Sequence, residues 1–394
     1  MIDLKKIFLC LFFFFLAISF CLAEEEISPT NTTTNENKFA ENAKSAIMIE
    51  ASTGTILYEK NKDDKLPMAS MTKMMTLLLI MEEIESGNLK WNEMITTSEH
   101  AASMGGSQIF LEVGEKMSVE DLVKGICIAS GNDASVAMAE RIGGTEEKFV
   151  SMMNKKAKEL SLSNTHFENA CGLDSDNHYS SANDMSIIAK ELVKHKKILE
   201  FSGTYEDYLR KNTEKSFWLV NTNKLVRYYQ GVDGLKTGYT KNAGYCITTT
   251  AERGNMRLIT VVMGEPSSAI RNSETTTMLD YGFNTYEAKK IITKDSVISK
   301  QKVEFGKKDS VELTPMEDYK VLKEKSSMNK NITYQLSSNP IKAPVKIGDK
   351  VGKIKIIENN KTIQEIDVTV KENISKMNIL KAYYKELIGM IKGN

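Results

Sequence analysis

The stretch LPMASMTKMMTLLLIM, residues 66–81, places one lysine inside a strongly apolar segment. As a helix from residue 71 to about 86, the segment is apolar on every side, which predicts a helix inside a protein core. Ser70 precedes this helix, and Lys73 follows three residues later. Because a charged side chain is costly to bury, Lys73 requires a functional explanation.

Ser70 and Lys73 lie on one face of such a helix, one turn apart. A serine hydroxyl is a poor nucleophile unless a base activates it. A lysine amine can be that base when a dry, positively charged pocket lowers its pKa. The backbone N–H of a serine at a helix start is also free to stabilise an oxyanion. The pair therefore predicts a nucleophile with its activator.

This spacing is not specific by itself. It recurs where solvated lysines are the simpler interpretation, at Ser299/Lys302 and Ser327/Lys330. Order and context add the specificity, because two further motifs follow along the chain. These are Ser130-Gly131-Asn132, in a break between apolar helical segments, and Lys236-Thr237-Gly238, in a stretch that reads as a strand.

In this order the three motifs resemble the signature of the penicillin-binding protein and serine β-lactamase superfamily. Within it, the chain resembles the low-molecular-weight penicillin-binding proteins, which are serine-type D-alanyl-D-alanine carboxypeptidases of peptidase family S11. Supporting stretches are ASGNDASVAMAE, HYSSANDMSIIA and GVDGLKTGYTKNAGYCITTTA, and KTGYT is closer to the Gram-positive members. The likeness is dense over residues 44–285. It implies an α+β fold, in which helices pack on the antiparallel sheet of a β-lactamase/transpeptidase-like domain.

The resemblance also implies three catalytic roles. Ser70 attacks the carbonyl between the two terminal D-alanines of a peptidoglycan stem peptide and forms an acyl-enzyme, while Lys73 accepts its proton. Ser130 passes a proton to the departing amine, and water then hydrolyses the acyl-enzyme. No cofactor and no metal are implied, and β-lactams are expected to be covalent inhibitors.

Five further residues are implied to bind substrate. They are Asn132 for the substrate amide, Lys236 and Thr237 for the terminal carboxylate, Gly238 for close approach of the substrate backbone, and Tyr239, whose N–H is the second oxyanion donor beside that of the nucleophile.

Other expectations concern charge. Arg271, in SSAIRNSE, resembles an arginine that assists carboxylate binding in relatives, and an ordinary surface salt bridge is the alternative. We expect Lys236 to keep Lys73 deprotonated by like-charge repulsion. The chain departs from certain bacterial carboxypeptidases at Thr222 and Tyr239, where those proteins carry arginine and histidine. These departures concern the details of carboxylate recognition and pH behaviour, not the acyl-transfer scheme.

Composition divides the chain into five segments. Residues 1–23 have two lysines, an apolar run and a small residue before three glutamates, as in a cleaved signal peptide, with an uncleaved anchor as the alternative. Residues 24–43 are polar and predict a disordered leader. The catalytic domain is expected at 44–290 and a small β-sandwich-like domain at 295–371. Within the catalytic domain, turn residues at Ser52-Thr53-Gly54 and Arg253-Gly254-Asn255 predict two hairpins. Ser118 with Asp121 predicts a helix cap, and helical periodicity returns over residues 146–160 and 184–198. Residues 372–394 predict an amphipathic helix, which either anchors the protein to a membrane surface or docks on the protein itself.

Charge and cysteine content exclude several classes of protein. The 394-residue chain balances 52 Lys+Arg against 52 Asp+Glu, unlike a nucleic-acid-binding protein. Cleavage of the signal peptide leaves Cys127, Cys171 and Cys246, too few for a disulfide framework. The histidines are scattered, which gives a metal site little support, and His178 is interpreted as a structural polar residue near the site.

The sequence thus predicts an exported, penicillin-sensitive carboxypeptidase that trims pentapeptide stems at the outer face of the cytoplasmic membrane or in the cell wall. A class A β-lactamase would need a glutamate within Glu-x-x-Leu-Asn, and this string does not occur. D,D-endopeptidase action on cross-links would use the same site and stays open. A non-catalytic receptor for β-lactams or cell wall is a further alternative, although every catalytic position is filled.

Overall fold

The computed structural model describes residues 39–326, 332–358 and 360–378. The predicted signal peptide, most of the predicted leader and residues 379–394 of the predicted C-terminal helix lie outside these ranges. Each of the two domains is described below by itself.

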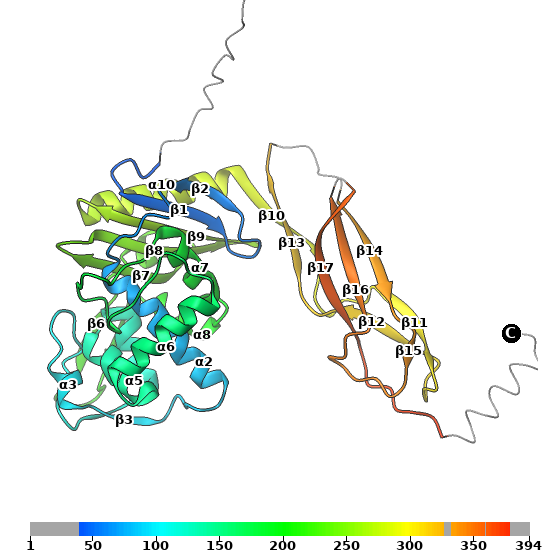
Figure 1. Cartoon of the computed structure of the whole chain (residues 1–394), viewed down its shortest axis with the longest axis horizontal. Coiled ribbons are helices and arrows are strands. Elements are labelled where there is room, and N and C mark those ends of the chain that lie inside the picture. The colour runs from blue at the N-terminus through cyan, green and yellow to red at the C-terminus, as the bar shows by residue number, and fades with distance from the viewer. Residues whose placement is uncertain (1–38, 327–331, 359, 379–394) are drawn as a thin grey trace, which may run out of the picture. The chain divides into compact units, whose positions relative to one another are not determined.

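A five-stranded antiparallel sheet lies at the centre of the first domain (Figure 1). In spatial order its strands are β2 (Ile56–Lys60), β1 (Ser45–Glu50), β9 (Met256–Glu265), β8 (Gly244–Arg253) and β7 (Val232–Thr240). The two hairpins predicted around residues 52–54 and 253–255 are both present. Strand β7, which carries the Lys-Thr-Gly motif, is therefore an edge strand.

Helices cover both faces of this sheet. Alternate side chains of β1 point to opposite faces, so Ile47 and Ile49 pack in a large helical cluster while Met48 packs with α10 (Ser268–Thr285). The helical cluster contains α2 (Lys73–Glu85), α5 (Asn132–Gly143), α6 (Glu146–Glu159), α7 (Ala182–Leu192) and α8 (Lys196–Ser202). The shorter elements are α3 (Glu99–Ala102), α4 (Val119–Lys124), α9 (Leu225–Tyr228), and the strand pairs β3 (Met94–Thr96) with β4 (Lys116–Ser118) and β5 (Glu206–Leu209) with β6 (Phe217–Val220).

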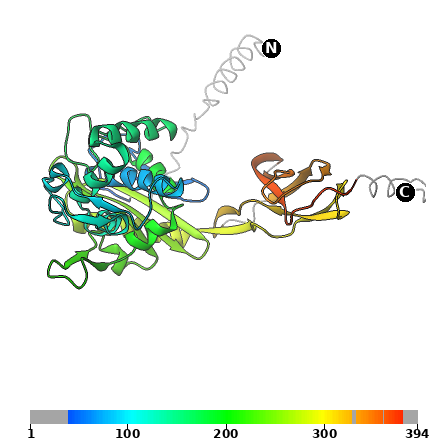
Figure 2. The ribbon, with the colours of Figure 1, turned by 90° about the horizontal axis from the view of Figure 1, so that it is seen from below.

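Helix α2 runs through the interior of this cluster, where other helices surround it (Figure 2). Every residue from Lys73 to Met81 is buried, as the apolar sequence predicts. The turn before it, η1 (Ala69–Thr72), is a 3₁₀-helix, so Ser70 lies in a tight turn and α2 begins at Lys73.

Local sequence signals also explain the next helices. Ser118 Oγ accepts a hydrogen bond from the N–H of Asp121 and caps α4, as predicted.

The helix predicted over 184–198 is instead two helices, α7 and α8. They separate because residues 193–195 turn the chain and bring Ile198 and Phe201 of α8 into the core.

The second domain is all-β. Strand β10 (Tyr286–Ile292) pairs with β13 (Tyr319–Glu324), and a six-stranded sheet has the order β14 (Ile332–Ser338), β16 (Gly352–Glu358), β17 (Lys361–Val370), β12 (Ser310–Pro315), β11 (Ser299–Glu304) and β15 (Ile341–Lys342). A separate hydrophobic core, from Ile292 to Ile374, holds these strands together. The all-β assignment of the sequence is confirmed.

Two predicted boundaries differ from the structure. Ala40 and Ala43, assigned to the leader, are buried against α10 and the sheet, so packing begins earlier than the polar composition suggests. Residues 372–378 form no helix. Ile374 is instead buried in the core of the second domain, where it bridges Val345, because tertiary contacts override the helical spacing.

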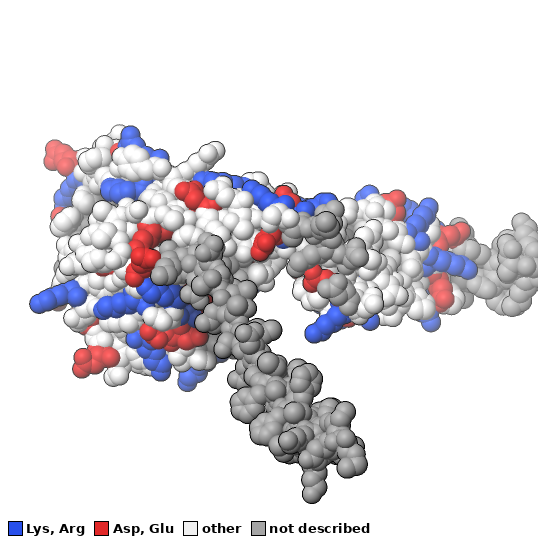
Figure 3. Space-filling view, turned by 90° about the horizontal axis from the view of Figure 1, so that it is seen from above, with Lys and Arg blue, Asp and Glu red and all other residues white. Residues whose placement is uncertain are grey.

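Charges of both signs are interspersed over the face shown in Figure 3. Among the residues that the structure describes, no helix has both the length and the apolar character needed to cross a membrane.

Candidate active site

The turn that carries Ser70 is held in an unusual backbone conformation. Ala69 has φ +48°, in the left-handed region that side chains with a Cβ seldom adopt. The Thr72 hydroxyl donates to the Ala69 carbonyl at 2.8 Å, and Thr72 Oγ1 lies 2.7 Å from His178 Nε2. Strain of this kind concentrates at functional sites when the surroundings enforce it.

Lys73 is fully buried, and its amine has three partners. Nζ lies 3.1 Å from Ser70 Oγ, 2.6 Å from Asn132 Oδ1 and 2.6 Å from the Cys171 carbonyl oxygen. Asn132 Nδ2 donates to the Gly105 carbonyl at 2.7 Å, which turns its amide oxygen toward the amine.

These partners determine what a neutral amine can do. A neutral amine has two hydrogens and one lone pair, whereas the amide oxygens of Asn132 and Cys171 can only accept. When both hydrogens of Lys73 go to those oxygens, the lone pair is left for the hydroxyl proton of Ser70. The arrangement therefore directs the lone pair of Lys73 at the Ser70 hydroxyl.

Burial lowers the pKa of Lys73 to about 8, while the carboxylate of Asp133 and the thiol of Cys171 act in the opposite direction. The repulsion that we expected from Lys236 is not the main cause. The repulsion between the two lysines lowers the pKa of Lys236 instead. That pKa is held well below its usual value first by burial and then by Lys73. With two lysines buried close together, charging one makes charging the other costlier.

Ser130 and Asn132 come from a break between two helices, as predicted. The one-turn π-helix η2 (Gly125–Ala129) ends at Ser130, which has φ +64° and is 3 % exposed. Asn132 then opens α5, and its N–H donates to the Ser107 carbonyl at 2.7 Å. π-Helical turns of this kind are frequent at functional sites.

The Lys-Thr-Gly motif lies in β7, whose side chains here are buried. Lys236 Nζ donates to the Thr237 carbonyl at 3.0 Å, and no carboxylate of the described residues lies within salt-bridge distance of it. The Thr237 hydroxyl donates to Thr222 Oγ1 at 2.8 Å. A buried lysine amine without an anionic partner is typical of a site that binds an anion, because the anion favours the charged form of the amine.

The structure gives a second reason for Gly238 beside the one expected. We assigned it to give the substrate backbone room. A Cβ at this position would lie 2.8 Å from the Met68 carbonyl oxygen and 3.1 Å from Ser70 N. The glycine thus lets β7 pack directly against the turn that carries the nucleophile, and this contact brings Lys236 and Ser70 into one site.

Comparison with known proteins identifies the family of this chain. A family model described as D-alanyl-D-alanine carboxypeptidase matches residues 30–267. The chain belongs to the D-alanyl-D-alanine carboxypeptidase family. A second model, described as the C-terminal domain of penicillin-binding protein 5, matches residues 286–376. The D-alanyl-D-alanine carboxypeptidase DacF of Bacillus subtilis is 49% identical over 354 residues, which are 90% of this chain and 91% of that protein.

Solved structures agree with this assignment. Penicillin-binding protein 5 from Haemophilus influenzae matches with a TM-score of 0.68 and 31% identity, covering 86% of this chain and 98% of that one. Penicillin-binding protein D2 from Listeria monocytogenes, in its ampicillin-bound form, matches with a TM-score of 0.56 and 32% identity over 61% of this chain and 98% of that one. The predicted family, fold class and carboxypeptidase activity are confirmed.

Arg271 of this carboxypeptidase is buried, so the alternative of a surface salt bridge is wrong. It is 5 % exposed, and its guanidinium donates to Asn272 Oδ1 and, at 3.4 Å, to the Cys246 carbonyl. Cys246 is paired with Gly238 across β7 and β8. Arg271 also contributes to the low pKa of Lys236. It therefore contacts β8, the strand beside the Lys-Thr-Gly motif, and adds positive potential at Lys236.

Tyr239 is 57 % exposed at the end of the same motif. Its ring lies 4.3 Å from that of Tyr245, centroid to centroid, on the neighbouring strand. The Thr240 hydroxyl donates to Asp174 Oδ1 at 2.7 Å and ties this end of β7 to a loop. A tyrosine pair, of which Tyr239 is exposed and Tyr245 is half-buried, thus borders the predicted carboxylate site.

Sequence reasoning missed the loop that carries Cys171. This loop contributes a backbone carbonyl to Lys73, and a carbonyl is present at every position of a chain. The only local signal is Asn169 followed three residues later by Gly172, which is typical of a turn. His178 is the buried structural residue expected near the site: burial lowers its pKa to about 4, and its Nδ1 accepts the N–H of Glu168.

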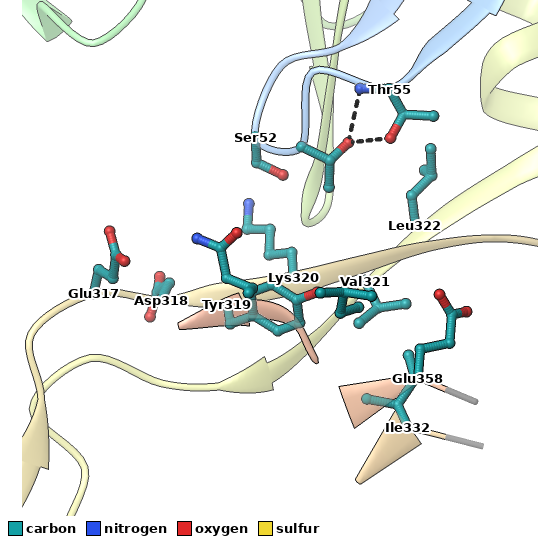
Figure 4. A pocket seen from close by; sticks show the side chains of 13 residues that line it. Ser52, Thr55, Glu317, Asp318, Tyr319, Lys320, Val321, Leu322, Ile332 and Glu358 are labelled. Carbon is teal, nitrogen blue, oxygen red and sulfur yellow. Dashed lines mark hydrogen bonds between the residues drawn. The ribbon is translucent and has the colours of Figure 1, made fainter. Parts of the chain in front are cut away.

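One surface pocket of the carboxypeptidase lies apart from the predicted catalytic residues. It is lined by Ser52 and Thr55 of the β1–β2 turn and by residues 317–322 around β13 (Figure 4). None of the predicted catalytic or substrate-binding residues lines it.

Proposed function

We propose that this protein removes the terminal D-alanine from peptidoglycan pentapeptide stems through an acyl-enzyme on Ser70. The observation that carries the proposal is the partner set of Lys73, in which two obligate acceptors leave the lone pair of a buried amine for the serine hydroxyl. A general base with a pKa near the working pH is effective in proton transfer.

The reaction has two steps. Ser70 Oγ bonds to the carbonyl carbon between the terminal D-alanines and gives its proton to Lys73. The C–N bond then breaks, Ser130 supplies a proton to the leaving amine of D-alanine, and Lys73 passes its proton to Ser130. In the second step Lys73 takes a proton from water as the water oxygen bonds to the same carbon. The ester bond to Ser70 Oγ then breaks, and Lys73 returns this proton to the serine.

Binding of the substrate follows from charge and backbone groups. Lys236, Thr237 and Arg271 provide positive potential and a hydroxyl for the terminal carboxylate, while Asn132 holds the substrate amide. The N–H groups of Ser70 and Tyr239 are assigned to the developing oxyanion. Strand β7 is at the sheet edge, where an extended peptide can add as a further strand.

Ampicillin and cefotaxime are bound in the solved structures of a related penicillin-binding protein, which supports covalent inhibition of this chain by β-lactams. We also propose export through residues 1–23 and attachment at the outer face of the cytoplasmic membrane through residues 379–394, since residues 372–378 belong to the second domain. Endopeptidase action on D,D-cross-links is the second candidate function, because it needs the same nucleophile and the same oxyanion donors.

The proposal is tested on the mature chain from Glu24, with Ser70→Ala in parallel. We expect the wild-type protein to release D-alanine from a peptide ending in D-Ala-D-Ala and to carry a penicillin adduct by intact mass. Ser70→Ala should lose both. A Ser70-dependent adduct without D-alanine release would reject the carboxypeptidase function and leave the endopeptidase or the receptor.

A further inference from the structure

The loop that presents the Cys171 carbonyl to Lys73 is folded around one side chain, that of Asn169. Its Oδ1 accepts the backbone N–H of Cys171 at 3.2 Å, of Gly172 at 2.6 Å and of Leu173 at 3.1 Å. Its Nδ2 donates to the Leu173 carbonyl at 3.0 Å. Four hydrogen bonds from one amide thus determine the direction of the peptide groups around Cys171.

The same loop rests against the nucleophile turn with no spare room. Gly172 has φ +90°, and a Cβ there would lie 2.0 Å from the Ala69 carbonyl oxygen and 2.9 Å from Ser70 N. Two residues before Gly172, the Ala170 carbonyl accepts the hydroxyl hydrogen of Thr76, on the next turn of α2 after Lys73, at 2.7 Å. The position of the loop relative to α2 is therefore fixed.

We propose that Asn169 is a positioning residue for acyl transfer. It acts through the Cys171 peptide, which it holds so that the neutral amine of Lys73 gives both hydrogens to amide oxygens and directs its lone pair at Ser70 Oγ. This inference rests on the proposed function of Ser70 and deepens it. Asn169 itself needs no contact with the reacting atoms.

Release of the Cys171 carbonyl would have two consequences. One hydrogen of the neutral amine would lose its acceptor, and the amine could then turn that hydrogen, instead of the lone pair, toward Ser70 Oγ. The charged ammonium would also lose an acceptor that stabilises it, so the pKa of Lys73 would fall further. A lower rate and an earlier deprotonation are a combination that simple destabilisation of the fold does not produce.

Other titratable groups lie around Lys73. Lys236 on β7, Asp133 on α5 and His178, which faces the serine turn, keep their places when Asn169 is substituted. The Cys171 thiol belongs to the loop itself, and its Sγ lies 3.6 Å from Asn169 Oδ1. A change in the pH profile that follows substitution of Asn169 is therefore attributable to the loop.

The test is the rate of acylation by penicillin, followed by intact mass as a function of pH in the mature chain. In Asn169→Ala the plateau rate should fall about 10- to 100-fold, because small misplacements of reacting groups cost this much. The rising limb of the profile should move to lower pH. Asn169→Asp keeps an acceptor for the three N–H groups and adds negative charge, so it should recover most of the plateau and move the limb to higher pH.

Asn154→Ala is the matched control. Asn154 accepts the N–H of Phe167 at 2.9 Å and donates to its carbonyl at 2.8 Å, so it holds the start of the same loop but not the peptide that faces Lys73. It should lower the thermal stability without moving the limb.

Two results would overturn the inference: a folded Asn169→Ala protein with the wild-type rate and profile, or an equal shift of the limb in Asn154→Ala. A wild-type protein that is acylated but releases no D-alanine would reject the carboxypeptidase function alone. The acylation profiles would then still decide the role of Asn169.

Discussion

Ser70/Lys73 and Ser299/Lys302 have the same spacing but lie in different structures. The first pair lies at the start of α2, where its polar atoms are 3.1 Å apart and the lysine is buried. The second pair lies in β11, where residues three apart point to opposite faces of the sheet and Lys302 is exposed. The comparison teaches that a motif has chemical meaning only in the secondary structure that brings its side chains together.

Replacing each lysine in turn should give the largest difference between the two pairs. Lys73→Ala should lower the rate of penicillin acylation by about 10² to 10⁴, the usual contribution of a general base. Lys302→Ala should leave the rate unchanged, since its amine is solvated on the second domain. Intact-mass kinetics on both variants would measure the difference, and equal rates would show that the buried amine is not the base.

The pH dependence of acylation sharpens the same contrast. The pKa of Lys73 is lowered to about 8 by burial, and only the neutral amine can accept the proton of Ser70. The wild-type rate should therefore rise about tenfold per pH unit on the acid side and level off above the pKa. A profile that is flat across neutral pH in a protein that stays folded would contradict this assignment.

A smaller effect is expected from the packing that joins the strand to the serine turn. Gly238→Ala places a Cβ 2.8 Å from the Met68 carbonyl oxygen, and overpacking of this kind costs about 1–3 kcal/mol in the free energy of unfolding. Acylation should slow because β7 and the turn move apart. Gly105→Ala is the control, because a Cβ there meets no atom within 4 Å. Denaturant unfolding and acylation rates should separate the two variants, and equal behaviour would reject the close-packing role of Gly238.

Much of the fold was readable in the sequence because its signals are local. The apolar run after Ser70 predicted the buried helix, and the turn residues predicted both hairpins of the sheet. The boundaries failed where distant contacts decide, as at Ala40, which packs with the second core of the first domain, and at Ile374, which is buried in the core of the second domain.

The site divides in the same way. Residue type and order were enough to predict Ser70 as the nucleophile, Lys73 as its base and the two later motifs. The causes of their properties were not: burial rather than Lys236 lowers the pKa of Lys73, and Gly238 makes room for the protein's own backbone. Nor could the sequence show that Arg271 is buried and contacts β8.

The sequence by itself determined which chemical groups the protein has and in what order, because side-chain chemistry and helix or strand periodicity are properties of short segments. Only the tertiary structure decided how those groups are oriented toward one another. The direction of the Lys73 lone pair depends on the carbonyl of Cys171, nearly a hundred residues away in the chain. A backbone carbonyl is common to all residues, so its role arises from position alone.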